Sequence, residues 1–169
     1  LSCINGASIA GAGRIVAIDV IASKLNLAKE FGATDVIDAS DGDPVEQVKE
    51  MFGGGVHYAF EAIGLKKTAE QCFEMLRAGG TATMIGMIPY GTKIEVHGAD
   101  FLQEKKILGC AMGSNRFRID MPNYVDFYLS GRLKLNELLS RHISLDQINE
   151  AFEALKTGEI ARSVIKFDA

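Results

Sequence analysis

A run of apolar residues from Ile15 to Ile18 ends at a single acidic side chain, Asp19. A short apolar run of this kind is typical of a strand buried in a parallel sheet, and it places the carboxylate at the carboxyl end of that strand. A carboxylate there can accept hydrogen bonds from two neighbouring hydroxyl groups, such as those of an adenosine ribose. The alternative is that Asp19 is a turn residue or helix cap, a common role for aspartate after a strand. Locally, both interpretations have about equal weight.

The neighbours of Asp19 favour a binding site. Lys24 lies where its ammonium group could approach a ribose or a phosphate. Ala62, Ile63 and Gly64 end another predicted strand with small and apolar residues, which suit a wall for an adenine ring. Ligands of parallel sheets bind at the carboxyl ends of the strands, where all these residues are expected.

The glycine clusters do not supply a phosphate loop. Gly11-Ala12-Gly13 begins like the G-x-G-x-x-G motif, but position 16 is Val and the segment precedes a strand instead of following one. We interpret it as a turn that ends a helix. A phosphate loop would be expected about 20 residues before Asp19, which places it before Leu1.

Other charged residues leave alternatives open. Glu61 could act as a general base, but a carboxylate bound to backbone amides or a neighbouring side chain is the favoured interpretation. Arg162 could be a surface charge, or it could fold back onto an anionic ligand. The three histidines are isolated and no Cys or His pair has zinc-site spacing, so no metal ligand is assigned.

Composition narrows the class of protein. The 169 residues are 47% hydrophobic with a net charge of -4, which fits a globular core and gives no basic surface for nucleic acid. No apolar run is long enough to span a membrane. Cys3, Cys72 and Cys110 are an odd number and far apart, which indicates buried, reduced thiols in a cytoplasmic protein.

Strands and helices alternate along the chain, which predicts crossover connections and an α/β fold with a parallel sheet. Strands are expected over 14–18, 34–37, 56–61, 81–85, 107–111 and 162–167, with a possible edge strand over 93–96. Helices are expected over 2–10, 24–30, 44–51, 67–77, 99–105, 119–130 and 145–156. Ser23 is expected to cap the second helix, and Pro44 to open the third. The pattern changes near Gly113, where we expect a domain boundary.

Several segments together carry a family resemblance. They are, in order, Gly11–Val20, Ser23-Lys24, Ala28–Thr34, Phe60–Gly64, Met84–Gly86, Ile107–Gly113 and Gly158–Ile165. These segments resemble the zinc-dependent, medium-chain alcohol dehydrogenases, and the match covers essentially the whole chain. The resemblance implies a Rossmann-type, doubly wound parallel sheet over residues 1–112, an NAD-binding domain without its first strand and glycine-rich loop. Residues 113–169 would be the C-terminal part of the catalytic domain.

The resemblance also implies how the adenosine end of NAD is bound. Asp19 would bind the ribose, with Lys24 beside it, and Ile63 would pack on the adenine. Arg162 would reach the pyrophosphate. Leu65 stands where some relatives carry an arginine near the adenine, so that contact is absent.

At the nicotinamide end, the resemblance implies that Ile85, Gly86 and Met87 line the ring. Backbone groups of Cys110 and Met112 would hold the carboxamide. Cys110 replaces a residue that is often alanine, so its contact depends on the backbone.

Asp19 favours NAD over NADP. A 2′-phosphate would meet its carboxylate, and Val20-Ile21-Ala22 supplies no arginine to compensate. A charge-assisted hydrogen bond contributes roughly 1.5–3 kcal/mol, so losing the ribose contacts should decide the preference.

In the resembled family, the catalytic zinc ligands precede the coenzyme domain and are not in this sequence. We therefore expect a fragment of an NAD(H)-dependent alcohol dehydrogenase that acts on an alcohol or aldehyde and is inactive alone. The alternatives are a zinc-free, quinone-reductase-like enzyme and a non-catalytic nucleotide-binding module.

The resemblance implies a homodimer through an edge strand at 93–96, where Ile94 and Val96 alternate with charged residues. The alternative is that this segment is a solvent-exposed arm.

Overall fold

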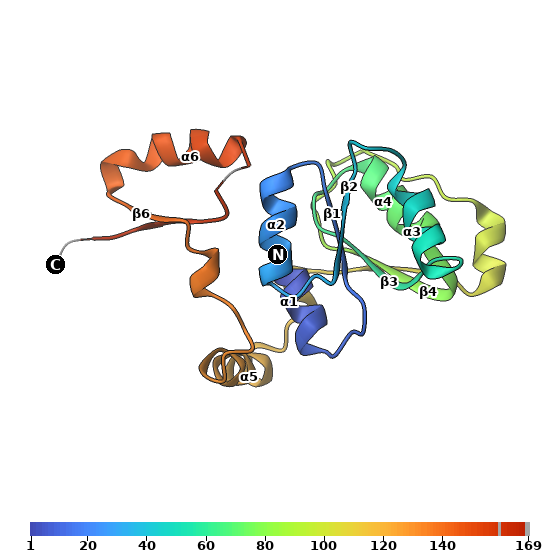
Figure 1. Ribbon diagram of the computed structural model, residues 1–169, viewed down its shortest axis with the longest axis horizontal. Coiled ribbons are helices and arrows are strands. Elements are labelled where there is room, and N and C mark those ends of the chain that lie inside the picture. The colour runs from blue at the N-terminus through green and yellow to red at the C-terminus, as the bar shows by residue number, and fades with distance from the viewer. Residues whose placement is uncertain (159, 168–169) are drawn as a thin grey trace. The chain divides into compact units, whose positions relative to one another are not determined.

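The computed structural model describes residues 1–158 and 160–167, and its strands and helices alternate as an α/β protein requires (Figure 1). In chain order the elements, with η for a 3-10 helix, are α1 Ser2–Ile9, β1 Val16–Asp19, α2 Ala22–Glu30, β2 Asp35–Asp38, α3 Pro44–Phe52, β3 Val56–Glu61, α4 Lys66–Glu74, β4 Leu76–Met84, η1 Gly98–Gln103, β5 Lys106–Gly109, η2 Met112–Ser114, α5 Phe117–Leu129, η3 Asn136–Leu138, β6 Arg141–Ile143, η4 Leu145–Gln147, α6 Ile148–Lys156 and β7 Ser163–Ile165.

The chain divides into two compact units. The first unit contains Leu1–Asp38 and the residues from Phe117 onward, and the second contains Ala39–Arg116. β1 pairs with β2 and β6 with β7 in the first unit, and the second holds a sheet in the order β3-β4-β5. Every one of these pairings is parallel. The predicted α/β class with parallel sheets is therefore confirmed.

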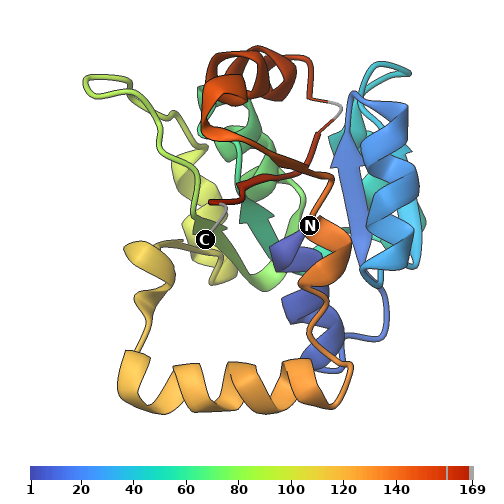
Figure 2. The same ribbon diagram turned by 90° about the vertical axis from the view of Figure 1, so that its left-hand side faces the viewer.

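Small residues build the core of the first unit. Ala17 on β1, Ala28 on α2 and Ala33 are buried together, and Ile4 of α1 packs against them. Figure 2 shows α2 lying alongside β1. Alanine side chains let helix and strand backbones approach closely, which holds the carboxyl end of β1 firmly beside the start of α2.

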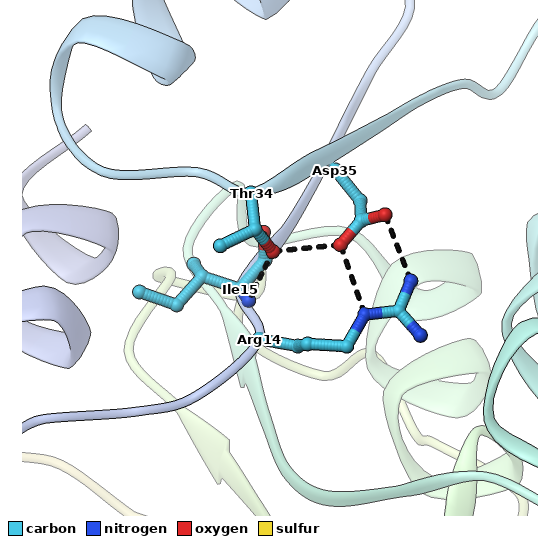
Figure 3. Close-up of polar contacts among 4 residues, drawn as sticks. All are labelled: Arg14, Ile15, Thr34 and Asp35. Atoms are coloured by element: carbon cyan, nitrogen blue, oxygen red, sulfur yellow. Dashed lines mark hydrogen bonds and ion pairs between the residues drawn. The ribbon is translucent and has the colours of Figure 1, made fainter.

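A polar cluster fixes the starts of β1 and β2. The guanidinium of Arg14 donates to Asp35 through Nη2 at 2.8 Å and Nε at 3.2 Å (Figure 3). The Thr34 hydroxyl accepts from the Ile15 amide at 2.9 Å and lies 2.6 Å from Asp35 Oδ2. These contacts set the register in which Val16 lies opposite Asp35 and Asp19 opposite Asp38.

The second unit has an aromatic core. Phe73 of α4 is fully buried against Leu76 and Ala82 of β4. Asp43 caps α3 by accepting from the Val45 amide at 2.9 Å, and Pro44 occupies the first helical turn. The expectation that Pro44 opens this helix is correct, and the cap by Asp43 is added by the structure.

The boundary between α4 and β4 is not where the sequence places it. The helix was expected to reach Arg77, but it ends at Glu74 and β4 already begins at Leu76. Leu76 pairs with Val56, and the next aligned pair is Tyr58 with Thr81. The intervening strand residues therefore bulge, and pairing with β3 overrides the turn that Gly79 and Gly80 indicate.

The expected edge strand over 93–96 is wrong, because residues 92–97 contain no strand. Side chains of α4 hold this segment instead. Lys66 Nζ donates to the Lys93 carbonyl at 3.1 Å, and the Glu95 amide donates to Glu70 Oε1 at 2.7 Å. Side chains from a helix thus replace partners that a neighbouring strand would supply.

The final strand is shorter than expected, since β7 covers only Ser163–Ile165, and its partner β6 is not predicted from the sequence.

Candidate functional site

Asp19 ends β1 and is half-buried. Its Oδ1 atom accepts hydrogen bonds from the amides of Val20 at 2.8 Å and Ile21 at 3.1 Å. Among the described residues, the Oδ2 atom has no hydrogen-bond partner. The turn role considered for Asp19 is therefore real, and it leaves one oxygen available to a ligand.

The start of α2 corrects the expected cap. The helix begins at Ala22 with Ile21 in the cap position and no side-chain cap, so Ser23 lies inside the helix. Asp19 explains the difference, because it already binds the amides that precede the helix. The structure thus places the acidic side chain immediately before a helix N-terminus.

Lys24 lies beside Gly158 and Ile21 within the first unit. A Cβ built on Gly158 would lie 2.5 Å from Ile21 Cδ1 and 3.2 Å from Lys24 Nζ, and Gly158 has a φ of +76°. Glycine is favoured here both by the positive φ and by this close approach. The segment after α6 is thereby brought to the predicted ribose site.

Arg162 is exposed and follows the same segment. Ser140 binds the backbone of Arg162 through two of its own groups. The Ser140 amide donates to the Arg162 carbonyl at 2.8 Å. Ser140 Oγ accepts from the amides of Ala161 at 3.0 Å and Arg162 at 3.4 Å. Asp19, Lys24 and Arg162 therefore all belong to the first unit.

Glu61 is the most deeply buried acidic residue at a strand end, with 1% of its surface exposed. Its Oε1 atom accepts from the amides of Ile63 at 2.9 Å and Gly64 at 2.8 Å, and from the Thr68 hydroxyl at 2.7 Å. The sequence interpretation of a carboxylate bound to backbone amides and a neighbouring side chain is confirmed.

Two opposing effects set the pKa of Glu61. Burial disfavours the charged form and raises the pKa, but the bonds from Thr68, Gly64 and Ile63 lower it by more. The pKa consequently lies below its ordinary value of 4.5. A carboxylate whose pKa is lowered is a weak base, which disfavours the general-base alternative.

The residues expected around the cofactor rings lie mainly on two loops of the second unit. Ile63 follows β3 and is 62% exposed, while Ile85 and Met87 follow β4 and are 39% and 91% exposed. Gly86 lies against Gly64, since a Cβ on Gly86 would be 2.2 Å from the Gly64 amide nitrogen. The loops therefore touch, and they present apolar side chains to solvent.

Cys110 and Met112 follow β5. The Cys110 amide donates to the Met84 carbonyl at 3.1 Å, so only its carbonyl is left for a ligand. Met112 is 97% exposed and has a positive φ of 48°. The backbone role predicted for Cys110 is thus restricted to accepting a hydrogen bond.

Sequence reasoning did not identify Thr68, Ser140 or Gly158 as parts of these arrangements. Thr68 lies seven residues after Glu61, and this spacing is the only feature of the local sequence that could indicate a contact between Thr68 and the strand-terminal acid. Ser140 acts on a segment 22 residues away, which no local pattern can reveal.

Among the residues described, no three of His, Cys, Asp and Glu gather in a way that could hold a metal ion. In the same part of the chain, no helix is both long and apolar enough to cross a membrane.

Comparisons with known proteins identify the family. The family described as zinc-binding dehydrogenase matches residues 1–130. Alcohol dehydrogenase 1 of Pisum sativum is 34% identical over 171 residues, covering 99% of this chain and 45% of that protein. Geraniol dehydrogenase of Carpoglyphus lactis is 35% identical over 168 residues, covering 99% and 44%. The chain therefore spans less than half the length of these relatives.

Solved structures agree. Benzyl alcohol dehydrogenase of Acinetobacter calcoaceticus matches with a TM-score of 0.93 and 32% identity, over 98% of this chain and 46% of that one. A zinc-binding dehydrogenase of Sinorhizobium meliloti 1021, solved bound to NADP, matches with a TM-score of 0.80 and 32% identity, over 88% and 43%. This chain belongs to the zinc-dependent, medium-chain alcohol dehydrogenase family.

Proposed function

We propose that this chain supplies the NAD(H)-binding part of an alcohol dehydrogenase, which transfers a hydride between an alcohol or aldehyde and nicotinamide. Residues 1–112 would contribute to the coenzyme domain and 113–169 to the catalytic domain. The observation that carries the proposal is Asp19, whose Oδ1 is held by two backbone amides while Oδ2 remains open to a ribose hydroxyl. Alcohol dehydrogenases among the relatives support the reaction class.

The chain's own residues fit the cofactor as follows. Asp19 would bind the adenosine ribose, Lys24 would lie beside it, and Arg162 would neutralise the pyrophosphate. The exposed side chains of Ile63 and Met87 offer apolar contacts to the rings. When bound, NAD would supply the hydride acceptor, and these residues would bind and orient it.

The nicotinamide end would be completed by Ile85, Gly86 and the backbone after β5. The carbonyl of Cys110 can accept from a carboxamide NH₂, since its amide is engaged by Met84. Met112 would contribute its own backbone amide.

Zinc is expected for the complete enzyme, but the described residues of this chain do not fit a metal ion. No described residue of this chain is therefore a proposed zinc ligand. The proposed ligands belong to other parts of the protein, and the 169-residue chain is proposed to be inactive alone.

Asp19 favours NAD over NADP, because its carboxylate would repel a 2′-phosphate. One relative was solved bound to NADP, so the preference of this chain between the two nucleotides is a direct test of the proposal. Titration of NADH and NADPH with the 169-residue chain, followed by nucleotide fluorescence, is expected to give saturable NADH binding and at least about tenfold weaker NADPH binding. Equal affinities would contradict the assignment, and a preference for NADPH would favour the quinone-reductase-like alternative.

Two further proposals concern the setting of the protein. Cys3, Cys72 and Cys110 are free thiols, which supports a reducing compartment such as the cytoplasm. We also propose a homodimer through the segment 93–96, as the family resemblance implies, although no strand forms there and Val96 packs against the core of its own unit. Sedimentation equilibrium tests the dimer, and a monomer at all concentrations would exclude it.

A further inference from the structure

Glu61 joins three segments of the second unit through one residue. Its side-chain Oε1 binds the two amides of the loop after β3 and the Thr68 hydroxyl on α4. Its backbone carbonyl accepts from the amides of Ile85 at 2.8 Å and Gly86 at 3.0 Å, in the loop after β4. The two loops that carry the predicted ring-binding residues are thus attached to the same residue.

The second carboxylate oxygen has a different environment. Oε2 is buried and has no hydrogen-bond partner in the part of the chain that the structure describes. A Cβ built on Gly86 would lie only 2.4 Å from it, so the oxygen fills the space that a side chain at position 86 would occupy. A Cβ on Gly64 would in turn lie 2.6 Å from the Met87 carbonyl oxygen. Carboxylate and glycines therefore pack as one closely fitted unit.

We propose that Glu61 is a positioning residue for the dinucleotide: its carboxylate holds the loop of residues 62–65 and packs against Gly86, its backbone carbonyl holds the loop of residues 85–88, and together they set the distance between Ile63 and Met87. This inference rests on the proposed function, since those side chains are the ones assigned to the cofactor rings. Glu61 itself does not touch the cofactor, because it is almost completely buried.

The geometry requires a carboxylate and not merely a side chain of similar size. Glutamine could keep the acceptor that binds Ile63, Gly64 and Thr68, but its NH₂ group would replace Oε2 against Gly86. Two buried donors would then lack acceptors, which is costly. The backbone bonds from Ile85 and Gly86 to the Glu61 carbonyl remain in Glu61→Gln, so we expect this variant to loosen the packing between the two loops while the remainder of the sheet stays formed.

The test compares variants of the 169-residue chain. Glu61→Gln removes the charge, and Thr68→Val removes one of the three bonds to Oε1. Glu74→Gln makes the same chemical change at an exposed position of α4. Val48→Ala, at a position with 1% exposure on α3, destabilises the second unit without touching either loop.

NADH affinity is measured at a temperature far below the unfolding midpoint of every variant. Glu61→Gln is expected to weaken NADH binding about tenfold and Thr68→Val by a smaller factor. Glu74→Gln and Val48→Ala should stay within about twofold of the parent. At that temperature every variant is folded, so a merely structural role would leave the affinity of Glu61→Gln as close to the parent as that of Val48→Ala. Equal affinity of these two variants would overturn the proposal.

Amide hydrogen exchange separates this inference from the proposed function. If the parent chain does not bind NADH, the proposed function fails, but the loops can still be examined. Faster exchange at Gly64 and Gly86 in Glu61→Gln, with unchanged protection in α3, supports the positioning role. Unchanged exchange at both glycines would overturn it whatever the nucleotide result.

Discussion

The Oδ1 atom of Asp19 accepts a hydrogen bond from the amide of Ile21 at 3.1 Å, so the two interpretations of this residue are compatible. One oxygen forms the turn that leads into α2. The other is oriented by that turn, and it is the atom that a ribose hydroxyl would need. A side chain held in place before a ligand arrives loses less conformational entropy on binding.

The first prediction separates these roles with Asp19→Asn. An asparagine carbonyl can still accept from Val20 and Ile21, so the unfolding midpoint should change little. NADH affinity should fall about tenfold, because a charge-assisted bond becomes neutral, and NADPH affinity should rise relative to it. Parallel titrations of both nucleotides measure this ratio.

Asp43→Asn is the matched control for Asp19→Asn. Asp43 Oδ1 likewise accepts from an amide two residues ahead, at 2.9 Å, but it caps α3 and is not one of the predicted binding residues. Its substitution should leave both nucleotide affinities unchanged. If Asp19→Asn behaves like Asp43→Asn, the ribose assignment is wrong.

Local chemistry explains which elements the sequence predicts well. The bounds of β3, Val56–Glu61, agree with the expectation, and Pro44 opens α3 as predicted. In both cases the signal lies in adjacent residues: an apolar run between glycines and an acid, and a capping pair. Glu61 is likewise correctly interpreted, because a strand-terminal acid followed by a glycine loop has amides close at hand.

Pairing between distant segments explains the errors. Leu76 joins β4 only because Val56 lies beside it, although Gly79 and Gly80 locally indicate a turn. β6 exists only through its pairing with β7, which follows 20 residues later. Ser140 and Gly158 act in the same way, through segments that are remote in sequence. Among the candidate site residues, Asp19, Lys24 and Ile63 follow from their own positions, whereas those after β4 and β5 required the family resemblance.

The second prediction concerns Asp35 and Arg14. The hydrogen bond from Arg14, followed by that from Thr34, holds the pKa of Asp35 below its ordinary value of 3.8. A depressed pKa contributes stability above the ordinary value that is lost as the pH falls through the folded-state pKa. Asp35→Asn should therefore lower the unfolding midpoint at pH 7 but not under strongly acidic conditions.

The expected change for Asp35→Asn is small, at most about 3 °C, because the ion pair is largely exposed to solvent. It should shrink in about 1 M salt. Thermal unfolding followed by circular dichroism measures it, with Asp41→Asn as an exposed control. If the unfolding midpoint of Asp35→Asn is lower than that of the parent by the same amount at acidic pH, lost packing and not lost charge is responsible.

The third prediction concerns the reactivity of Cys72. Burial against the Phe73 cluster, together with the nearby charge of Glu61, raises the pKa of this thiol from 9.0 to about 12. At pH 8 the thiolate fraction should therefore be roughly a thousandfold smaller than in the unfolded chain, and alkylation correspondingly slower. Mass spectrometry of peptides after timed iodoacetamide treatment measures the rate.

The same Cys72 peptide labelled in denaturant supplies the reference rate. Cys72 is only partly buried, so it should react slowly in the folded unit, and its labelling rate should increase as added denaturant opens the unit. A native labelling rate within about tenfold of the unfolded rate would contradict the burial seen here.

The fourth prediction concerns Asn5, which connects α1 to the chain segment after α5 within the first unit. Asn5 is 3% exposed. Its Nδ2 donates to the Arg132 carbonyl at 3.1 Å, and its Oδ1 accepts from the Lys134 amide at 2.9 Å. The side chain of Arg132 in turn donates to the carbonyl of Ile9 at the end of α1, and the side chain of Lys134 donates to the carbonyl of Glu30 at the end of α2.

Asn5→Ala removes both side-chain bonds and leaves the backbone groups of Arg132 and Lys134 without their partner. The free energy of unfolding should fall by about 2 kcal/mol, whereas the exposed Asn26→Ala should change it by no more than about 0.5 kcal/mol. Denaturant titration measures both values, and hydrogen exchange at Lys134 reports whether the loss is local. If Asn5→Ala matches Asn26→Ala, the segment is held by Arg132 and Lys134 alone, and the buried amide contributes nothing to it.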